Sequence, residues 1–530
     1  MIPDISFDID KSEFAGMVED AGAPVLVQLM AKVSTKCSPL QLYSTLQNAD
    51  FSYMLESVEK EKRHARFSFV GSDPDVVVTI KDRILTLEYS MDSKLVEYIR
   101  LRLESLCTVE SVKSGVFRSH INEGTDVLDA FRAVFPTANG TRLLNRKGFD
   151  RQSFLGGAIG YNSYDIVYDC WLDIEKELES GVPDMQFALT TRTFVFDHLT
   201  GDTHIVVTPF VTQQCDFGAV YDQALSDARA LHLQLNNISG MSDQANRTMK
   251  RLRTSEHVCN AGLEQEEFEN AVLTAKQYII DGDIFQVVLS RRYSIKIKQT
   301  PLELYQTLRK INPSPYMYIF KFGDLSIVGA SPETLMAVYN RKVITNPIAG
   351  TCPRGENEQE DNVLSSIMLA DEKECAEHIM LVDLGRNDVR MVSKSGTVTV
   401  DDFMSVVKYS HLQHIESTVC GTLRDECDQF DATRAIFPAG TLSGAPKIRA
   451  MEIIDKLEPD ARGIYGGGVG YYSWNGDADF AIVIRTVIIK GDTAYIQAGA
   501  GIVADSDPTY EYEETERKMA AMISAIEGGQ

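Results

Sequence analysis

The sequence predicts an α+β fold with large antiparallel sheets, surrounding helices and two intertwined lobes. Strand-like and helix-like patterns both occur throughout the chain, but they do not follow the strict alternation of a doubly wound fold. The chain has 530 residues, of which 44% are hydrophobic, so it is long enough for two large lobes or one extensive core.

The first half mixes strands and helices. Apolar, β-branched runs at residues 24–29 and 76–80 predict strands, whereas the apolar spacing of residues 219–233 predicts a helix. Residues 236–260 are polar and lack sustained apolar periodicity, so we interpret them as the main linker. The predicted domains are therefore residues 1–240 and residues 260–530.

The second half opens with a helix whose apolar stripe covers residues 268–279 and which stops at Gly282. A buried strand is predicted at 284–290. Thr300 and Pro301 then supply the N-cap and the first-turn proline of a helix through Ile311. Further predicted strands are residues 325–328, 335–339, 342–345, 481–489 and 494–498.

Composition restricts the classes of function. The net charge of −24 argues against nucleic acid or an anionic membrane surface as a partner. Nine cysteines without a Cys-x-x-Cys spacing indicate reduced thiols and a cytoplasmic setting, and no segment has the roughly 18 uncharged apolar residues of a membrane span. The first residues lack the features of a secretory signal. An anionic substrate would need a metal ion, buried cations or backbone N–H groups.

Two pairs of glutamates share a spacing of three residues. Glu374 and Glu377 lie in a predicted helix at 371–381, and Glu511 and Glu514 lie in a helix that opens at Pro508. Two helices that direct carboxylates at one cavity would make an all-oxygen site for Mg²⁺. The alternative is two solvated helix faces, with Glu514 and Lys518 as an ordinary surface pair.

Four glycine-containing segments are predicted as loops that bring backbone close to a ligand: residues 347–351, 439–447, 465–468 and 499–501. The second has a Gly-x-x-x-Gly-x-x-Lys spacing, which is not the pattern of a phosphate-binding loop. The alternative for that segment is a loop that enters a helix, with Ser443 as the N-cap.

Three side chains are candidates for chemistry. Arg485 lies in an apolar stretch, where its guanidinium needs either a substrate carboxylate or an internal Asp or Glu. His414 lies in a predicted strand and is either a catalytic acid or base or a structural histidine. Glu333 is either an acid or base or a turn carboxylate.

Taken together, these segments resemble the chorismate-utilising enzymes, and most closely the large subunit, component I, of anthranilate synthase. The resemblance covers residues 156–161 and nearly everything from 268 to 525. It implies that Glu377 and Glu514 ligate Mg²⁺, with Glu374 and Glu511 nearby. It also implies substrate-binding roles for these residues: Gln286, Gly350, Thr351, Tyr465, Arg485, Gly499, Ala500, Gly501 and Lys518.

Two positions distinguish branches of this family. Relatives that add water to the ring have a lysine base where this chain has Gln286, and aminodeoxychorismate synthases have a lysine nucleophile in place of Ala349. The resemblance then implies attack by ammonia on C2 of chorismate, with Glu333 as the acid. Elimination of pyruvate, aided by His414 and Thr441, gives anthranilate. Aminodeoxychorismate synthase remains the alternative enzyme.

A regulatory site is predicted in the first half. Residues 54–57 resemble the tryptophan-binding Leu-Leu-Glu-Ser motif of the family, and residues 312–317 resemble the strand that faces it. The resemblance implies feedback inhibition by tryptophan, held by these residues: Leu55, Glu56, Ser57, Pro315, Tyr316 and Met317. The alternatives are simple packing with a turn, or a tryptophan-sensing relative without turnover.

No cysteine lies in a Gly-x-Cys-x-Gly nucleophile turn. The resemblance therefore implies that ammonia comes from glutamine through a separate amidotransferase subunit, component II, within a heterotetramer.

Overall fold

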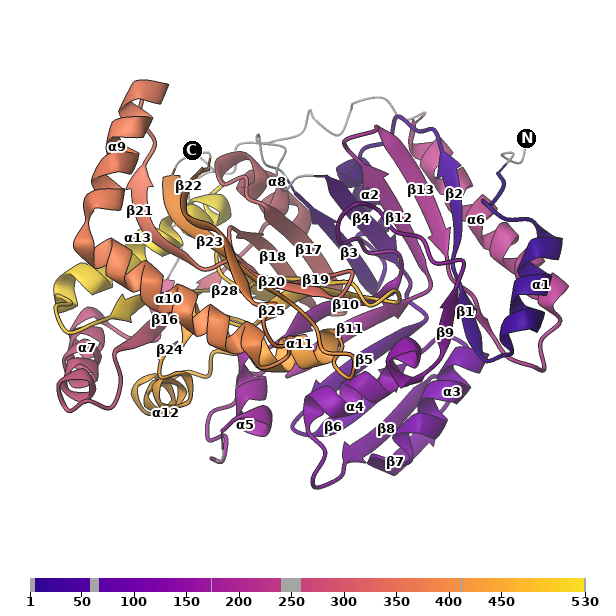
Figure 1. Ribbon diagram of the computed structural model, residues 1–530, viewed down its shortest axis with the longest axis horizontal. Helices are drawn as coiled ribbons and strands as arrows, with labels where there is room; N and C mark the ends of the chain where they lie inside the picture. Colours follow the sequence, from indigo (N-terminus) through magenta and orange to yellow (C-terminus); the bar gives the residue numbers. More distant parts are fainter. Residues whose placement is uncertain (1–4, 58–65, 173, 240–258, 410–411, 529–530) are drawn as a thin grey trace.

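Two large antiparallel sheets form the centre of the protein in the computed structural model (Figure 1). The structure describes residues 5–57, 66–172, 174–239, 259–409 and 412–528. All the strand pairs in both large sheets of this part are antiparallel, and helices cover the sheets. The predicted α+β fold class is therefore confirmed.

The first large sheet has 13 strands. In spatial order they are β21 (Ile348–Pro353), β23 (Leu412–Thr422), β20 (Lys342–Thr345), β19 (Thr334–Tyr339), β26 (Ala478–Ile482), β25 (Gly468–Ser473), β10 (Gly157–Asn162), β11 (Met185–Thr190), β5 (Val76–Lys81), β6 (Ile84–Glu88), β8 (Val116–Ile121) and β7 (Cys107–Lys113), with β22 (Thr399–Lys408) paired to β23.

The second large sheet has 12 strands. They are β15 (Cys259–Ala261), β16 (Gln286–Lys296), β28 (Thr493–Ile502), β27 (Thr486–Lys490), β18 (Leu325–Ser331), β17 (Tyr316–Phe322), β3 (Phe51–Glu56), β4 (Phe67–Ser72), β12 (Arg192–Asp197), β13 (Asp202–Val207) and β2 (Leu29–Val33), with β24 (Gly444–Ala445) paired to β16. A small third sheet contains β14 (Phe210–Val211), β1 (Val25–Val27) and β9 (Arg142–Leu144).

The two halves of the sequence share both large sheets. In the first sheet β10 pairs with β25, and in the second β3 pairs with β17, where Glu56 lies opposite Met317. The division into domains at residues 1–240 and 260–530 stays a prediction. Both large sheets contain strands from each of these two ranges.

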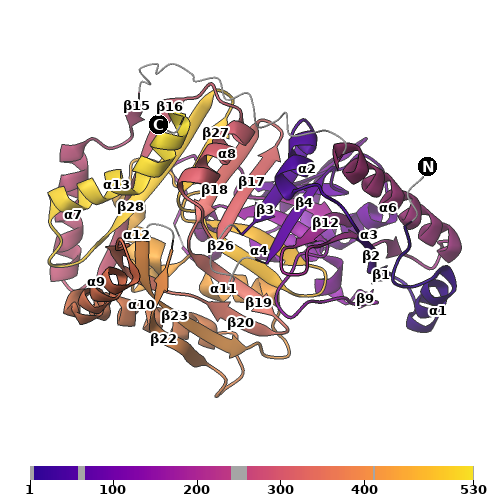
Figure 2. The same cartoon turned by 90° about the horizontal axis from the view of Figure 1, so that it is seen from above.

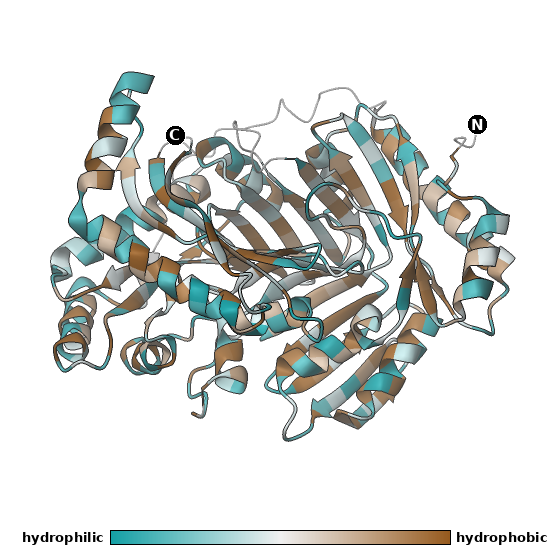
Figure 3. Ribbon diagram, viewed as in Figure 1, coloured by the Kyte–Doolittle hydropathy of each residue, from teal (hydrophilic) through white to brown (hydrophobic). Residues whose placement is uncertain are grey.

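The sheets pack face to face, with helices on their outer faces. Alternate residues of β17 point in opposite directions: Tyr318 and Phe320 pack between the sheets, whereas Met317 and Ile319 pack against outer helices. The inner layer is apolar and contains Tyr161 and Ile327 as well. Burying each such side chain stabilises the fold by about 1.5–3 kcal/mol. Figure 3 shows the apolar residues concentrated along the central strands.

The helices divide between the two outer faces. The core of the 12-stranded sheet includes α1 (Lys11–Ala21), α2 (Pro39–Leu46), α6 (Phe217–Ser239), α8 (Pro301–Ile311) and α13 (Pro508–Ile526). The core of the 13-stranded sheet includes α3 (Lys94–Leu103), α4 (Val127–Val134), α5 (Val167–Cys170), α10 (Glu372–Arg390) and α11 (Gln429–Ile436). Seen from above in Figure 2, α7 (Gln265–Ile280) lies beside α13, while α9 (Glu358–Ala370) and α12 (Lys447–Leu457) lie toward the same end of the molecule.

Local signals placed several helix ends correctly. The Thr300 hydroxyl accepts from the Glu303 N–H at the start of α8, and Pro301 occupies the first turn. Helix α7 ends at Ile280, and Gly282 follows with φ +84°. Helix α13 begins at Pro508, as predicted.

Four predicted elements are wrong in detail. Residues 499–501, predicted as a loop, belong to strand β28, because they pair with β16. The stretch 481–489 is not one strand: β26 belongs to the 13-stranded sheet and β27 to the 12-stranded sheet, because the chain changes sheets between them. Residues 348–351 belong to strand β21, since they pair with β23. Ser443 is not an N-cap; its hydroxyl donates to the Ala439 carbonyl, and α12 starts after Pro446.

The predicted linker begins later than expected. Residues 236–239 form the end of α6, and residues 240–258 lie outside the described residues. The strand predicted at 24–29 is divided into β1 and β2 at Gln28. The eight cysteines whose environment the structure describes are free thiols. None of the helices among the described residues combines the length and apolar character that a membrane crossing requires.

Candidate functional site

The two predicted glutamate pairs come from two helices that face one site. Glu374 and Glu377 lie on α10, and Glu511 and Glu514 lie on α13. Burial raises the pKa of Glu374, and the charges of Glu377 and Glu514 raise it further. Burial likewise raises the pKa of Glu511, with Glu514 adding to the effect. The acids of the two helices are therefore within electrostatic reach of one another.

Gln286, the first residue of β16, connects these acids to the neighbouring strand β28. Its side-chain Nε2 donates to Glu377 Oε1 over 2.8 Å. A methyl group placed on Gly501 would lie 2.7 Å from that Nε2 and 3.6 Å from Glu377 Oε1. A side chain at position 501 would therefore displace the Gln286 amide from its present contact with Glu377.

Lys518 links α13 to the glycine strand. Its Nζ lies 2.6 Å from Glu514 Oε1 and donates to the Gly499 carbonyl over 2.8 Å. Ala500, between the two glycines of β28, is fully buried in the core beneath them. The lysine therefore holds Glu514 next to the backbone of β28.

Arg485 occupies the bend where the chain passes from β26 to β27. Its φ of +52° is in the left-handed region, which is rare for a side chain of this size and marks a constrained position. Burial lowers the pKa of its guanidinium, and its Nη1 donates to the Lys518 carbonyl over 2.7 Å.

Among the described residues, no Asp or Glu oxygen lies within 4.0 Å of the Arg485 nitrogens. No described acid therefore forms an ion pair with Arg485, although the charge of Glu514 acts on its guanidinium from a greater distance. A buried guanidinium without a carboxylate is suited to bind a carboxylate ligand. Tyr465, also buried, lies within electrostatic reach of the same guanidinium.

Glu333 is a buried acid between β18 and β19. Burial raises its pKa to about 8, the charge of Glu416 adds to the rise, and the Thr441 hydroxyl, which donates to Glu333 Oε1 over 2.8 Å, opposes it. Glu333 is therefore protonated near neutral pH and able to donate a proton.

His414 on β23 lies opposite Thr351 of β21. Its Nδ1 is 3.0 Å from the Gly350 carbonyl and 3.0 Å from the Thr351 hydroxyl. Burial lowers the pKa of the imidazole to about 4, so the ring is neutral at neutral pH. Because a carbonyl can only accept, Nδ1 carries the proton and Nε2 keeps the lone pair of a base.

The sequence did not single out the buried pair Glu458 and Arg462, which supports the site. Arg462 donates to both Glu458 oxygens, to the Leu442 carbonyl and to the Val288 carbonyl. It thereby joins the loop that carries Thr441 to strand β16. The four-residue spacing of the two charges was the available signal, but burial could not be read from it.

The donor set of the site fits a hard cation. All four acids offer oxygen, and the buried Gln286 Oε1 has no hydrogen-bond partner among the residues that the structure describes. Within the described part of the chain, no three His, Cys, Asp or Glu side chains converge closely enough to hold a metal ion by themselves. A cation at this site would therefore take only one or two of the carboxylates and complete its shell with water and ligand oxygens, as Mg²⁺ can.

The residues predicted to bind tryptophan line a second cavity, which has a volume of about 700 Å³ and lies between the two sheets. Leu55, Glu56 and Ser57 line it from β3 and the residue that follows, and Pro315, Tyr316 and Met317 line it from β17 and the residue before. Met317 contributes only its edge, because its side chain packs into the core on the outer face of the sheet. The buried Ser57 hydroxyl has no hydrogen-bond partner within the described ranges of the chain.

Glu56, in contrast, is already paired. Its carboxylate accepts from Arg309 Nε over 2.6 Å and from the Tyr305 hydroxyl. The ammonium group of a bound amino acid could contact Glu56 only by sharing this carboxylate with Arg309.

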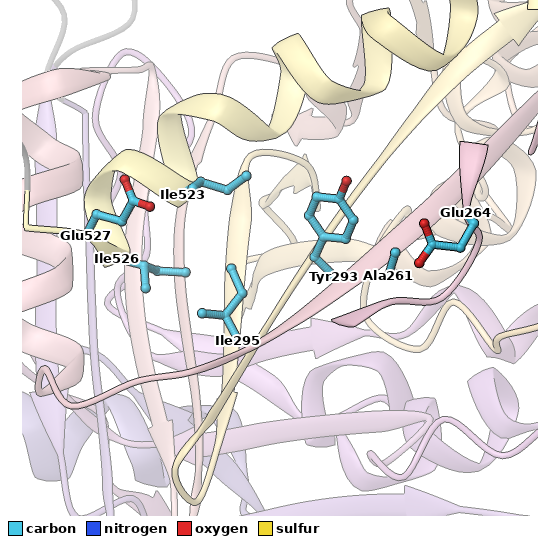
Figure 4. Close-up of a pocket in the computed structure, with 7 residues that line it drawn as sticks. All are labelled: Ala261, Glu264, Tyr293, Ile295, Ile523, Ile526 and Glu527. Carbon is cyan, nitrogen blue, oxygen red and sulfur yellow. The ribbon is translucent and has the colours of Figure 1, made fainter. Parts of the chain in front are cut away.

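A third hollow is separate from both sites. It has a volume of about 300 Å³ and lies between α13, β16 and the start of α7. Figure 4 shows Ile523 and Ile526 of α13 beside Ile295 and Tyr293 of β16, with Glu527 and Glu264 toward opposite sides of the view. None of the predicted site residues lines it.

The site combines three features near the point where the chain passes from one large sheet to the other. They are a buried guanidinium without an ion-pair partner among the described residues, acids from two helices, and a glutamate that is protonated at neutral pH. This fold and site define a class of protein: an enzyme that acts on a small anionic substrate.

Comparison with known proteins agrees. Residues 138–524 match the family model of chorismate binding enzymes. The chain is 45% identical to anthranilate synthase component 1 of Haloferax volcanii, over 98% of this chain and 97% of that one. The crystal structure of anthranilate synthase component I from Streptococcus pneumoniae TIGR4 matches with a TM-score of 0.65 and 33% identity, covering 92% of this chain and 97% of that one. The menaquinone-specific isochorismate synthase of Escherichia coli shares the fold, with a TM-score of 0.63, 16% identity and coverage of 97% and 99%. The chain therefore belongs to the chorismate-binding enzyme family, and within it to the proteins named anthranilate synthase component 1.

Proposed function

We propose that this enzyme converts chorismate and ammonia to anthranilate and pyruvate, as a Mg²⁺-dependent carbon–oxygen lyase in tryptophan biosynthesis. The observation that carries the proposal is the state of Gln286. Its amide is hydrogen-bonded to Glu377, so the residue in the position of a water-activating base is a neutral donor that cannot deprotonate water.

The residues of the site suit the steps of this reaction. Arg485 would bind a carboxylate of chorismate, and Glu333 would protonate the C4 hydroxyl as it leaves while ammonia forms a bond to C2. The aminated ring then loses a proton from C2 and expels pyruvate, which restores aromaticity. His414 Nε2, unprotonated at neutral pH, is suited to accept that proton, and Thr441 keeps Glu333 oriented.

The acids of α10 and α13 would hold the cation. Glu377 and Glu514 are the proposed ligands, and Glu374 and Glu511 lie near enough to influence them or to bind through water. When bound, Mg²⁺ would fix the ring carboxylate and stabilise negative charge that develops on it.

The product assay tests this function. We expect the purified chain to form fluorescent anthranilate and pyruvate in equal amounts from chorismate, Mg²⁺ and ammonium, and to form none with glutamine alone. The reason is that no glutaminase nucleophile turn is present in the sequence.

Three outcomes would contradict parts of the proposal. Amination without pyruvate release would indicate an aminodeoxychorismate synthase, and no product at any ammonium concentration would favour a non-catalytic relative. Turnover with glutamine alone would remove the need for the amidotransferase partner, component II, and for the heterotetramer.

We also propose that tryptophan inhibits the enzyme from the cavity between the sheets. Support comes from the cavity's apolar lining at Pro315 and Tyr316, which suits an indole. Further support comes from the buried Ser57 hydroxyl, which has no hydrogen-bond partner among the described residues and suits a polar group of an amino acid.

Replacing Ser57 by Phe should remove the inhibition. The larger side chain would overfill the polar end of the cavity, at a cost of about 1–3 kcal/mol to ligand binding, or about 10- to 100-fold in affinity. Calorimetry with tryptophan and the inhibited rate measure this. Ser52→Ala is the control, because Ser52 lies on β3, the strand that ends just before Ser57, and does not line the cavity. Undiminished inhibition in the Ser57 variant would reject the assignment.

A further inference from the structure

Lys447 closes the Gly-x-x-x-Gly-x-x-Lys pattern, and the structure gives this lysine a role unrelated to phosphate. It is the first residue of α12, and only 12% of its side chain is exposed. Its Nζ donates to Asp388 Oδ2 over 2.7 Å and to the Ile436 carbonyl over 2.9 Å. The Lys447 ammonium therefore forms its hydrogen bonds with groups of the protein itself.

These contacts join three helices. Asp388 lies near the end of α10, Ile436 is the last residue of α11, and Lys447 starts α12. Helices α10 and α11 lie side by side (Figure 1). The lysine thus ties both ends of the loop at residues 437–446 to each other and to α10. We refer to Asp388 and Lys447 as the clasp.

The loop held by the clasp carries Thr441. It lies directly on α10: a methyl group on Gly440 would be 2.2 Å from Leu384 Cδ2, so there is no room for a side chain. Further along, Gly444 and Ala445 pair with β16 next to Gln286. The loop is therefore fixed at its α10 side and at its β16 side.

A cavity of about 30 Å³ connects the clasp to the proposed acid. Glu333, Thr441 and Asp388 all line it, together with Gly440 and Asn346. The clasp acid Asp388 and the hydrogen-bonded pair of Thr441 and Glu333 therefore border the same small cavity. A shift of the loop at the clasp would therefore reach the hydrogen bond between Thr441 and Glu333.

We propose that Asp388 and Lys447 are positioning residues: the clasp holds the loop so that the Thr441 hydroxyl meets Glu333. The inference rests on the proposed function, in which Glu333 is the acid. Neither residue contacts the proposed substrate-binding groups; both act through Thr441. Misplacement of a catalytic group by about 1 Å can lower a rate about 100-fold, so we expect the catalytic rate to depend on how firmly the loop is held.

The test is a double-mutant cycle between the clasp and Thr441. The clasp is removed with Asp388→Asn and Lys447→Met together, because loss of one partner would leave an unpaired buried charge and endanger folding. We expect kcat of the ammonia-dependent reaction to fall about 10- to 100-fold, while KM for chorismate changes by less than about threefold. In a Thr441→Val background, the same two changes should lower kcat by less than about threefold.

A pH profile separates positioning from a structural effect. Because the Thr441 hydroxyl lowers the pKa of Glu333, loss of the clasp should move the alkaline limb of the profile upward, as Thr441→Val does. Thermal unfolding monitors the fold. The control is a second ion pair, between Lys147 and Asp8, which has the same 2.7 Å separation and contains no residue of the proposed site. It is removed by Lys147→Met and Asp8→Asn together, and kcat should then stay within about twofold of wild type.

Equal losses with and without the Thr441 hydroxyl, or an unshifted pH profile, would overturn the inference. An unchanged kcat in the clasp variant would do the same while wild-type anthranilate formation continued. Failure of the wild-type chain to form anthranilate would instead reject the proposed function, so the two failures are distinguishable.

Discussion

Replacement of Glu333 by Gln is expected to lower kcat about 1,000-fold, because the C4 hydroxyl of chorismate would leave without a proton donor. Gln keeps the size and the ability to hydrogen-bond with Thr441, so the fold and chorismate binding should survive. The measurement is anthranilate fluorescence at saturating chorismate, compared with wild type.

The pH dependence makes this prediction specific. With a pKa of about 8, Glu333 carries its proton below pH 8, so wild-type kcat should fall as the pH rises above 8 at a fixed concentration of un-ionised ammonia. The Gln variant should lack that alkaline limb. Thr441→Val should keep the limb but shift it upward, because it removes the hydrogen bond that stabilises the carboxylate.

The same group affects stability. Its folded pKa is higher than the usual value of 4.5, so its contribution to stability is fully present below pH 4.5 and is lost as the pH rises through about 8. Glu333→Gln should remove this loss, and the variant should unfold at a higher temperature than wild type at pH 9. An activity profile identical to wild type, with its alkaline limb retained, would exclude Glu333 as the acid.

Replacement of Glu514 by Gln is the second change with a large expected effect. Gln is a weaker ligand for a hard cation and leaves Lys518 without its ion-pair partner. We expect kcat/KM to fall about 1,000-fold, which corresponds to about 4 kcal/mol of transition-state stabilisation. Calorimetric titration of Mg²⁺ in the presence of chorismate should show affinity weakened by at least about 10-fold.

Glu513→Gln is the matched control. Glu513 is the neighbouring residue on α13, its side chain is 61% exposed and it faces Arg517, so activity and Mg²⁺ affinity should stay within about twofold of wild type. Equal effects of the two substitutions, or full activity of wild type in the presence of a strong chelator, would contradict the proposed metal site.

The elements of the fold that depend on neighbouring residues could be predicted from the sequence. Thr300 and Pro301 marked the start of α8, and the three-residue spacing placed Glu374 with Glu377 on one helix. The resemblance to the chorismate-utilising enzymes could be recognised because many motifs occur in the same order, and the comparisons confirm the family.

Long-range contacts were beyond the reach of such patterns. The apolar run around Arg485 has the composition of one strand, and its division between two sheets depends on pairing with strands more than 100 residues away. Similarly, residues 348–351 have the composition of a loop, yet pairing with β23 makes them part of a strand.

By itself, the sequence determined which chemical groups the protein has and which of them share a helix or strand, because periodicity and capping act over a few residues. Only the tertiary structure decided their states: the left-handed backbone of Arg485, the raised pKa of Glu333, the lowered pKa of His414 and the inward turn of Lys447. The physical reason is that burial and the placement of distant charges set these properties, and both arise when segments far apart in the chain pack together.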